Sequence, residues 1–186
     1  MKRFYTAVWA AVMILVLLCV NAAAGEALLA PAEKENLWGY ADAAGEWIIA
    51  PQYSSGTDFY GDYAVVGIAS GGLAVINTRG ETVLDGILGI DWVSSGHSDP
   101  HDRYWVYGRE SDDEGYFRPL GCFDRQTGKT AELNPTEGYE FPFEIKTEDS
   151  LLPVYDSANP DRQVFYDPEK GELVFSSRPS SEEPDA

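Results

Sequence analysis

Both histidines of this 186-residue chain fall in one short loop, where imidazole and carboxylate groups could hold a metal ion. His97 and His101 stand four residues apart with Asp99 between them, and these ligand types suit transition metals. Pro100 disfavours the helix that would place both rings on one face. The chain has no third imidazole, so we expect no metal site here. The candidate ligands for such a site are His97, Asp99 and His101, and without a metal the segment is a solvated loop.

Other chemistry has even less support. The acidic run Glu110–Gly115 starts like a calcium-binding loop, but the position that needs a bidentate Glu falls on Gly121, so the run predicts a charged hairpin turn. Residues 96–100 lack the closing Gly and the strand–turn–helix setting of a nucleophile elbow. We therefore expect no catalytic residue, no cofactor and no enzymatic activity. The alternative is a carbohydrate-active or metal-assisted hydrolase using acids near the 97–102 loop, since 31 acidic residues supply many carboxylate pairs.

Aromatic side chains are the remaining functional candidates, because ring platforms bind sugars and peptides alike. The candidate binding aromatics are Tyr60, Tyr63, Trp92 and Trp105. The alternative is that they form the core, since a small β domain must fill its interior with rings. Cys122 is predicted to be a buried thiol, because its neighbours read as a strand.

The element that would position such groups is a β-hairpin at residues 38–53. Strand-forming residues Trp38–Tyr40 and Trp47–Ile49 flank a turn framed by Asp42 and Gly45. Asp at the first turn position can accept backbone N–H groups, and Gly tolerates the positive φ that closes the turn. Pro51 is expected to end the second strand, and Gly39 to leave bare backbone against which a ring can lie.

The same pattern recurs along the chain. Asn77–Glu81, with Gly80, repeats Asp42–Glu46 at an offset of 35 residues, and looser copies follow at 122–129 and 165–172. Turn chemistry alone can produce such patterns, so chance resemblance is the alternative for the copy at 73–84 as well as for the two later copies. A recurring hairpin predicts a repeat architecture.

Residues 38–66 resemble the WG repeat, a short motif of bacterial proteins, and 73–88 resemble a degenerate copy. The residues that carry the resemblance are Trp38, Gly39, Tyr40, Asp42, Gly45, Pro51, Tyr53, Asn77 and Gly80. This resemblance implies a β-rich interaction scaffold and supplies no catalytic residue or cofactor.

Strand-like runs follow one another at short spacing after residue 36, and no later segment shows a sustained helical period. We predict an all-β domain of antiparallel hairpin repeats that forms an irregular blade array or partly open barrel, preceded by a signal-peptide helix. The predicted strands are 37–41, 47–49, 63–69, 72–77, 81–84, 104–109, 115–124, 139–145, 152–155, 163–167 and 172–176.

The first 24 residues have the layout of a secretory signal peptide: Lys2 and Arg3, an apolar run from Ala7 to Val20, and small residues at the exit. An uncleaved anchor and a lipid-modified Cys19 are the alternatives. We expect a leader or tether at 25–36, a repeat domain at 37–175 and a disordered polar tail at 176–186.

Cleavage would remove two positive charges and no acid, and would take the formal net charge from −18 to −20. Such a charge opposes binding to nucleic acid or anionic lipid. We expect a secreted module, or one on the extracellular face of the envelope, that binds a protein, peptide or envelope polymer. A purely structural extracellular spacer is the third alternative.

Overall fold

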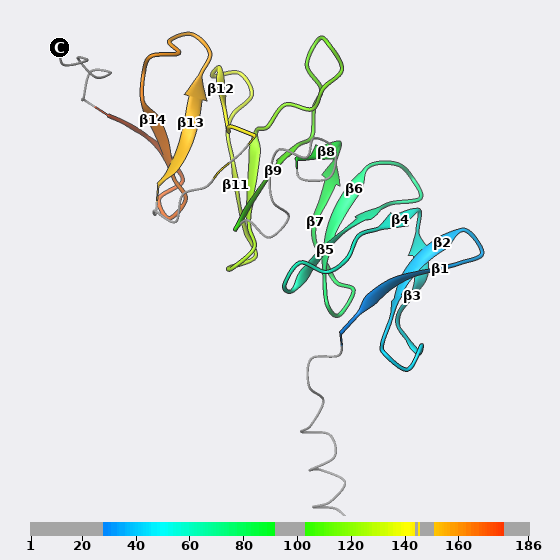
Figure 1. Cartoon of the computed structure of the whole chain (residues 1–186). Coiled ribbons are helices and arrows are strands. Elements are labelled where there is room, and N and C mark those ends of the chain that lie inside the picture. The colour runs from blue at the N-terminus through cyan, green and yellow to red at the C-terminus, as the bar shows by residue number, and fades with distance from the viewer. Residues whose placement is uncertain (1–27, 92–102, 144, 146–150, 177–186) are drawn as a thin grey trace, which may run out of the picture.

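A computed structural model describes residues 28–91, 103–143, 145 and 151–176. Within these residues all regular structure is β-strand, and the strands form four small antiparallel sheets, none of which closes into a barrel. Figure 1 shows the sheets arranged in a row in chain order. The all-β, antiparallel prediction is confirmed, whereas the signal-peptide helix lies outside the described residues. Among the residues that the structure describes, there is no helix with the length and apolar character needed to cross a membrane.

Each sheet is a meander in which neighbouring strands follow one another along the chain. A single residue, Ser54 or Leu88, separates the last strand of one sheet from the first of the next at the first two junctions. The first sheet holds β1 (Ala30–Lys34), β2 (Leu37–Ala41) and β3 (Trp47–Tyr53). The second holds β4 (Ser55–Gly56), β5 (Tyr63–Gly67), β6 (Leu73–Asn77) and β7 (Thr82–Ile87). The third holds β8 (Gly89–Ile90), β9 (Tyr104–Gly108), β10 (Gly121–Asp124) and β11 (Lys129–Glu132). The fourth holds β12 (Tyr139–Glu140), β13 (Leu152–Asp156), β14 (Val164–Asp167) and β15 (Glu172–Phe175).

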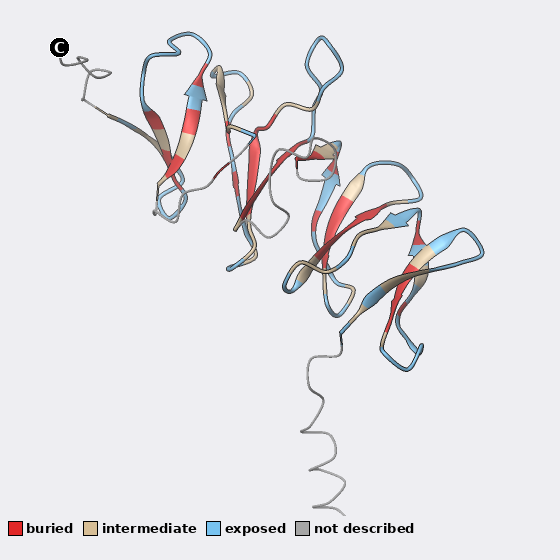
Figure 2. Ribbon diagram, viewed as in Figure 1, coloured by how far each residue is buried: buried red, intermediate tan, exposed pale blue. Residues whose placement is uncertain are grey.

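The core consists of three apolar clusters, one at each junction between successive sheets. Successive side chains of a strand point to opposite faces. On β5, Ala64 and Val66 therefore belong to the cluster shared with the first sheet, and Val65 to the cluster shared with the third. The two middle sheets are thus buried on both faces, and Figure 2 shows their central strands as buried. This explains why β5 and β9 are continuous apolar runs without polar alternation.

The sequence missed four strands, β1, β4, β8 and β11, and the tether predicted at 25–36 is wrong over Ala30–Lys34. Ala30–Lys34 looks unlike a strand because Pro31 cannot donate a backbone hydrogen bond, but β1 is an edge strand, where that is tolerated. It reaches β2 through a two-residue turn at Glu35 and Asn36, both with positive φ (56° and 63°).

Two predicted strands are much shorter than expected. The strand predicted at 115–124 begins only at Gly121, and the strand predicted at 139–145 ends at Glu140. Both ranges contain a proline, Pro119 or Pro142, which lacks the N–H that a strand ladder uses.

Pro51 does not end its strand, because β3 continues to Tyr53. Here β3 is an edge strand and its pairing with β2 is irregular opposite Gly39, two conditions under which proline fits a sheet. A Cβ on Gly39 would lie 2.5 Å from the Ile49 carbonyl oxygen and 2.7 Å from the Pro51 nitrogen. Gly39 is therefore required by close backbone contact and not, as predicted, by an overlying ring.

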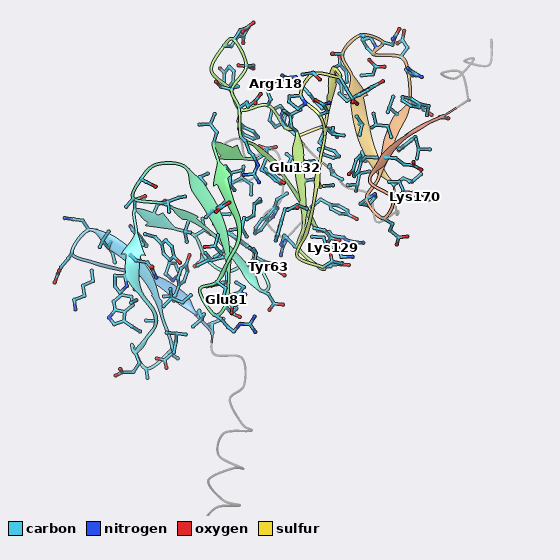
Figure 3. The ribbon with its side chains drawn as sticks, turned by 180° about the vertical axis from the view of Figure 1, so that it is seen from behind. Tyr63, Glu81, Arg118, Lys129, Glu132 and Lys170 are labelled. Carbon is cyan, nitrogen blue, oxygen red and sulfur yellow. The ribbon has the colours of Figure 1, made fainter. Side chains whose placement is uncertain are left out.

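The Asp/Asn–Gly turns predicted from the sequence occupy equivalent places. Each joins the last two strands of its sheet and closes on a glycine of positive φ: Gly45, Gly80, Gly128 and Gly171. In every one the leading side chain accepts backbone N–H groups, as when Asp42 Oδ1 accepts from Ala44 (2.9 Å) and Glu46 (3.0 Å). Figure 3 shows Glu81 and Lys170, from two of these turns, and Lys129, which directly follows a third, on one side of the molecule.

Candidate functional site

The metal candidates His97, Asp99 and His101, and the candidate binding residue Trp92, lie outside the described residues. Within the described ranges, no group of three His, Cys, Asp or Glu side chains is arranged to hold a metal ion. The acidic run is a hairpin turn as predicted: Ser111 bridges Phe117, and Asp112 Oδ1 accepts from Glu114 N and Tyr116 N.

Trp105 is a core residue, 2% exposed, so its prediction as a binding aromatic is wrong. Its ring stacks on Phe123 at 5.8 Å between centroids, with the Arg125 guanidinium 5.0 Å from the ring centre. Tyr60 and Tyr63 are partly buried against the same cluster and lie edge-on to Trp105 and Phe123. These rings fill the junction between the second and third sheets, as the core alternative expected.

Cys122 is buried, as predicted, on the face of β10 that meets the fourth sheet. Burial raises the pKa of its thiol well above the usual value, because the thiolate would lose its solvation, and nearby Asp124 adds to the rise. The cysteine therefore belongs to the core in this fold.

A cleft of about 660 Å³ opens between the third and fourth sheets, within the size range of ligand sites. Its walls are the end of β11 with the following loop on one side, and β14, the next turn and β15 on the other. It is lined by Glu132, Leu133, Asn134, Glu137, Tyr139, Tyr166, Gly171, Glu172, Leu173 and Phe175. A smaller cleft of about 110 Å³ adjoins it and shares Glu132 and Leu133.

Carboxylates and aromatic rings dominate this lining, which contains no Lys or Arg. Glu132, Glu137 and Glu172 are exposed, and Phe175 is 45% exposed. Such a surface suits a ligand that combines positive charge with apolar parts, since cations are attracted both to carboxylates and to ring faces.

Glu132 is held in place from the smaller cleft. Its Oε1 accepts hydrogen bonds from the Tyr107 hydroxyl (2.7 Å) and from Arg109 Nε (3.1 Å) and Nη2 (3.0 Å). Burial, and then the contact with Glu132, raises the pKa of Tyr107 well above its usual value, so the phenol stays a neutral donor. One carboxylate oxygen is thus fixed by three donors, and the group is positioned before any ligand arrives.

Neighbouring side chains also hold the Phe175 ring in place. The Arg162 guanidinium lies 4.2 Å from its ring centre, and the Tyr139 ring lies 6.2 Å away at a tilt. The sequence missed this site because its residues come from β11 and the following loop and from β12, β14, the next turn and β15, which are brought together only by the packing of two sheets.

Three further apolar side chains are exposed on the first sheet. Leu37 (38% exposed), Trp47 (37%) and Ile48 (50%) belong to β2 and β3, and none of them is part of the cluster shared with the second sheet. These residues line neither of the two clefts.

Residues 38–68 match the family model of the WG containing repeat. The predicted resemblance at 38–66 is therefore confirmed over β2 and β3 of the first sheet and β4 and β5 of the second. Comparison with curated proteins and with solved structures gave no match.

Proposed function

We propose that this chain is an exported, non-enzymatic interaction module, built as an open array of β-sheet blades, that binds a protein, peptide or envelope polymer in the cleft between its third and fourth sheets. The observation that carries the proposal is the lining of that cleft, which combines partly exposed rings with three carboxylates and no basic side chain. The WG repeat at 38–68 supports a scaffold role, because a repeat scaffold acts through its surfaces.

The test of the cleft compares two half-exposed aromatic residues of the fourth sheet. Phe175 lines the cleft at 45% exposure, whereas Tyr155 on β13 is 50% exposed and lines neither cleft. Purified wild-type domain, Phe175→Ala and Tyr155→Ala would be applied to arrays of random peptides and of envelope glycans. We expect the strongest wild-type signals to fall about tenfold in Phe175→Ala and to persist in Tyr155→Ala.

Equal loss in both variants, or in neither, would show that the cleft is not the binding site. The same arrays, analysed by mass spectrometry after overnight incubation, report on catalysis. Cleavage of a peptide or glycan that disappears on substitution of one carboxylate would contradict the non-enzymatic proposal.

Export is tested separately. The charged start, apolar run and small-residue exit of residues 1–24 support removal of a signal peptide. Intact-mass measurement of the protein recovered from the medium should show the loss of about 24 residues. The full-length mass, or a lipid adduct on Cys19, would refute the proposal of a cleaved, secreted protein.

A further inference from the structure

Two sheet edges border the cleft. β11 is the last strand of the third sheet and β15 the last strand of the fourth, and each pairs with a neighbour on one side only. Among the described residues no strand pairs with the outer side of either. Unpaired edges of this kind are templates for an added strand.

The register shows which backbone groups face outward on β15. Ser176 N donates to Gln163 O at 3.1 Å, so these two residues form a hydrogen-bonded pair at the end of the β14–β15 ladder. Hydrogen-bonded and non-hydrogen-bonded pairs alternate along an antiparallel ladder. The backbone N–H and C=O groups of Leu173 and Phe175 therefore point away from β14, toward the open edge.

The same reasoning applies to β11. Leu133 N donates to Leu120 O at 2.8 Å, which places Thr130 and Glu132 in the non-hydrogen-bonded pairs of the β10–β11 ladder. Three of the four residues with outward backbone groups, Glu132, Leu173 and Phe175, line the cleft. Figure 3 labels Glu132 on β11 and Lys170 in the turn before β15, the two elements that border it.

We propose that the cleft binds an extended basic peptide, which adds as a strand to the outer edge of β15. The inference rests on the proposed function and specifies its ligand. Backbone hydrogen bonds to Leu173 and Phe175 would supply affinity, and alternate side chains would reach Glu132, Glu137 and Glu172, as in other cases of strand addition.

Charge complementarity selects a basic peptide over an acidic or neutral one. The cleft lining carries three carboxylates and no cation, and the chain as a whole carries −18. Glu132 is already paired with Arg109 at 3.0 Å, so the charge that attracts a basic ligand comes mainly from Glu137 and Glu172. Lys170, which precedes the lining residue Gly171, is paired with Asp167 at 2.7 Å. A polysaccharide bearing amines would satisfy the charge but has no regular row of amide N–H and C=O groups for the strand edge, so the peptide is favoured.

The experiment uses a labelled, end-blocked octapeptide of alternating Lys and Val, with each residue N-methylated in turn. Only every second N–H of an added strand faces β15, so N-methylation should weaken binding about tenfold at alternate positions and less than twofold at the positions between. Substitution Glu172→Gln should also weaken binding, whereas Glu114→Gln should not, because no residue of the 111–117 hairpin lines either cleft.

A uniform response to N-methylation would refute strand addition, as would equal affinity for a glucosamine oligosaccharide of similar charge. No binding of the unmethylated peptide would also overturn this inference. The proposed function would survive that result if the arrays still gave Phe175-dependent binding, and it would fail if they did not.

Discussion

Replacement of Gly39 by Ala tests the structural interpretation of the WG repeat, because two physical effects predict opposite changes in the stability of the folded protein. Ala restricts the unfolded chain more than Gly and should stabilise an ordinary strand position by roughly 0.5–1 kcal/mol. At Gly39, however, the new methyl would lie 2.5 Å from the Ile49 carbonyl oxygen, 2.7 Å from the Pro51 nitrogen and 2.9 Å from the Ala50 carbonyl carbon. All three are backbone atoms and cannot rotate away.

Overpacking of this kind costs typically about 1–3 kcal/mol, and the shift of β3 that relieves it would disturb the contacts of Tyr40 and Ile49 in the first core cluster. We therefore expect Gly39→Ala to destabilise the domain by roughly 1 kcal/mol, and by no more than about 2.5 kcal/mol, after the backbone-entropy gain is subtracted. Urea unfolding followed by tryptophan fluorescence gives the free energy of unfolding. We expect the variant to unfold at a lower urea midpoint, with an unchanged dependence of the free energy on urea concentration.

Gly45 provides the matched control, because it has a φ of +84° and no atom within 4 Å of its missing Cβ. Gly45→Ala should cost roughly 1–2 kcal/mol through backbone strain alone. Gly45→Asn should cost less, since Asn tolerates positive φ, whereas Gly39→Asn should be at least as harmful as Gly39→Ala. A stabilised Gly39→Ala protein would refute the close backbone contact between β2 and β3.

Three further predictions concern the other sheets. Gly128→Ala should destabilise the domain, because its φ is +69° and its Cβ would lie 2.5 Å from the Tyr63 hydroxyl, and a thermal-melt series should show Tyr63→Phe recovering part of that loss. Burial alone would raise the pKa of Asp124, but hydrogen bonds from Arg103, Gln126 N and Thr127 outweigh it and hold the pKa below its usual value. The stability that this contributes is present above the unfolded-state pKa of about 3.9 and is lost as the pH falls through the folded-state value, so urea midpoints should drop less on acidification in Asp124→Asn than in wild type. Cys122 should react with a thiol reagent only in denaturant, and labelling of the folded protein within minutes would contradict its buried position.

The sequence predicted the features that depend on local chemistry. Asp42–Gly45 and Asn77–Gly80 could be recognised because an acceptor side chain and a glycine three residues later together specify the turn. The longer turn Asp124–Gly128 was found on the same grounds. All three turns join the last two strands of a sheet, so their recurrence reflects the architecture.

The 35-residue spacing alone would have assigned the wrong turn to the repeat. Asp112–Gly115 stands 35 residues after Asn77–Gly80 and forms the same hydrogen bonds, yet it belongs to a hairpin inserted between the second and third strands of its sheet. Turn chemistry is local, whereas the place of a turn in a repeat depends on pairing across the sheet. The same limit hid the short strands β4 and β8, whose glycines give no strand signal and which follow β3 and β7 after a single residue.

The candidate site could not be predicted for a related reason. The rings at Tyr63 and Trp105 look like binding residues because they are large and aromatic, but the sequence does not show which face of a strand meets another sheet. In this fold the middle sheets bury both faces, so their aromatics become core. Two of the partly exposed rings, Tyr139 and Phe175, line the cleft at the junction with the last sheet.

Mapping of backbone amide shifts by NMR, during titration of the full domain with the Lys–Val octapeptide, tests the central claim most directly. The account predicts the largest shifts at Leu173, Phe175 and Tyr139, around the cleft, and unchanged amides at Trp47 and Ile48 on the first sheet. Shifts centred on Trp47 and Ile48, or spread evenly over the acidic surface, would contradict a binding site between the third and fourth sheets.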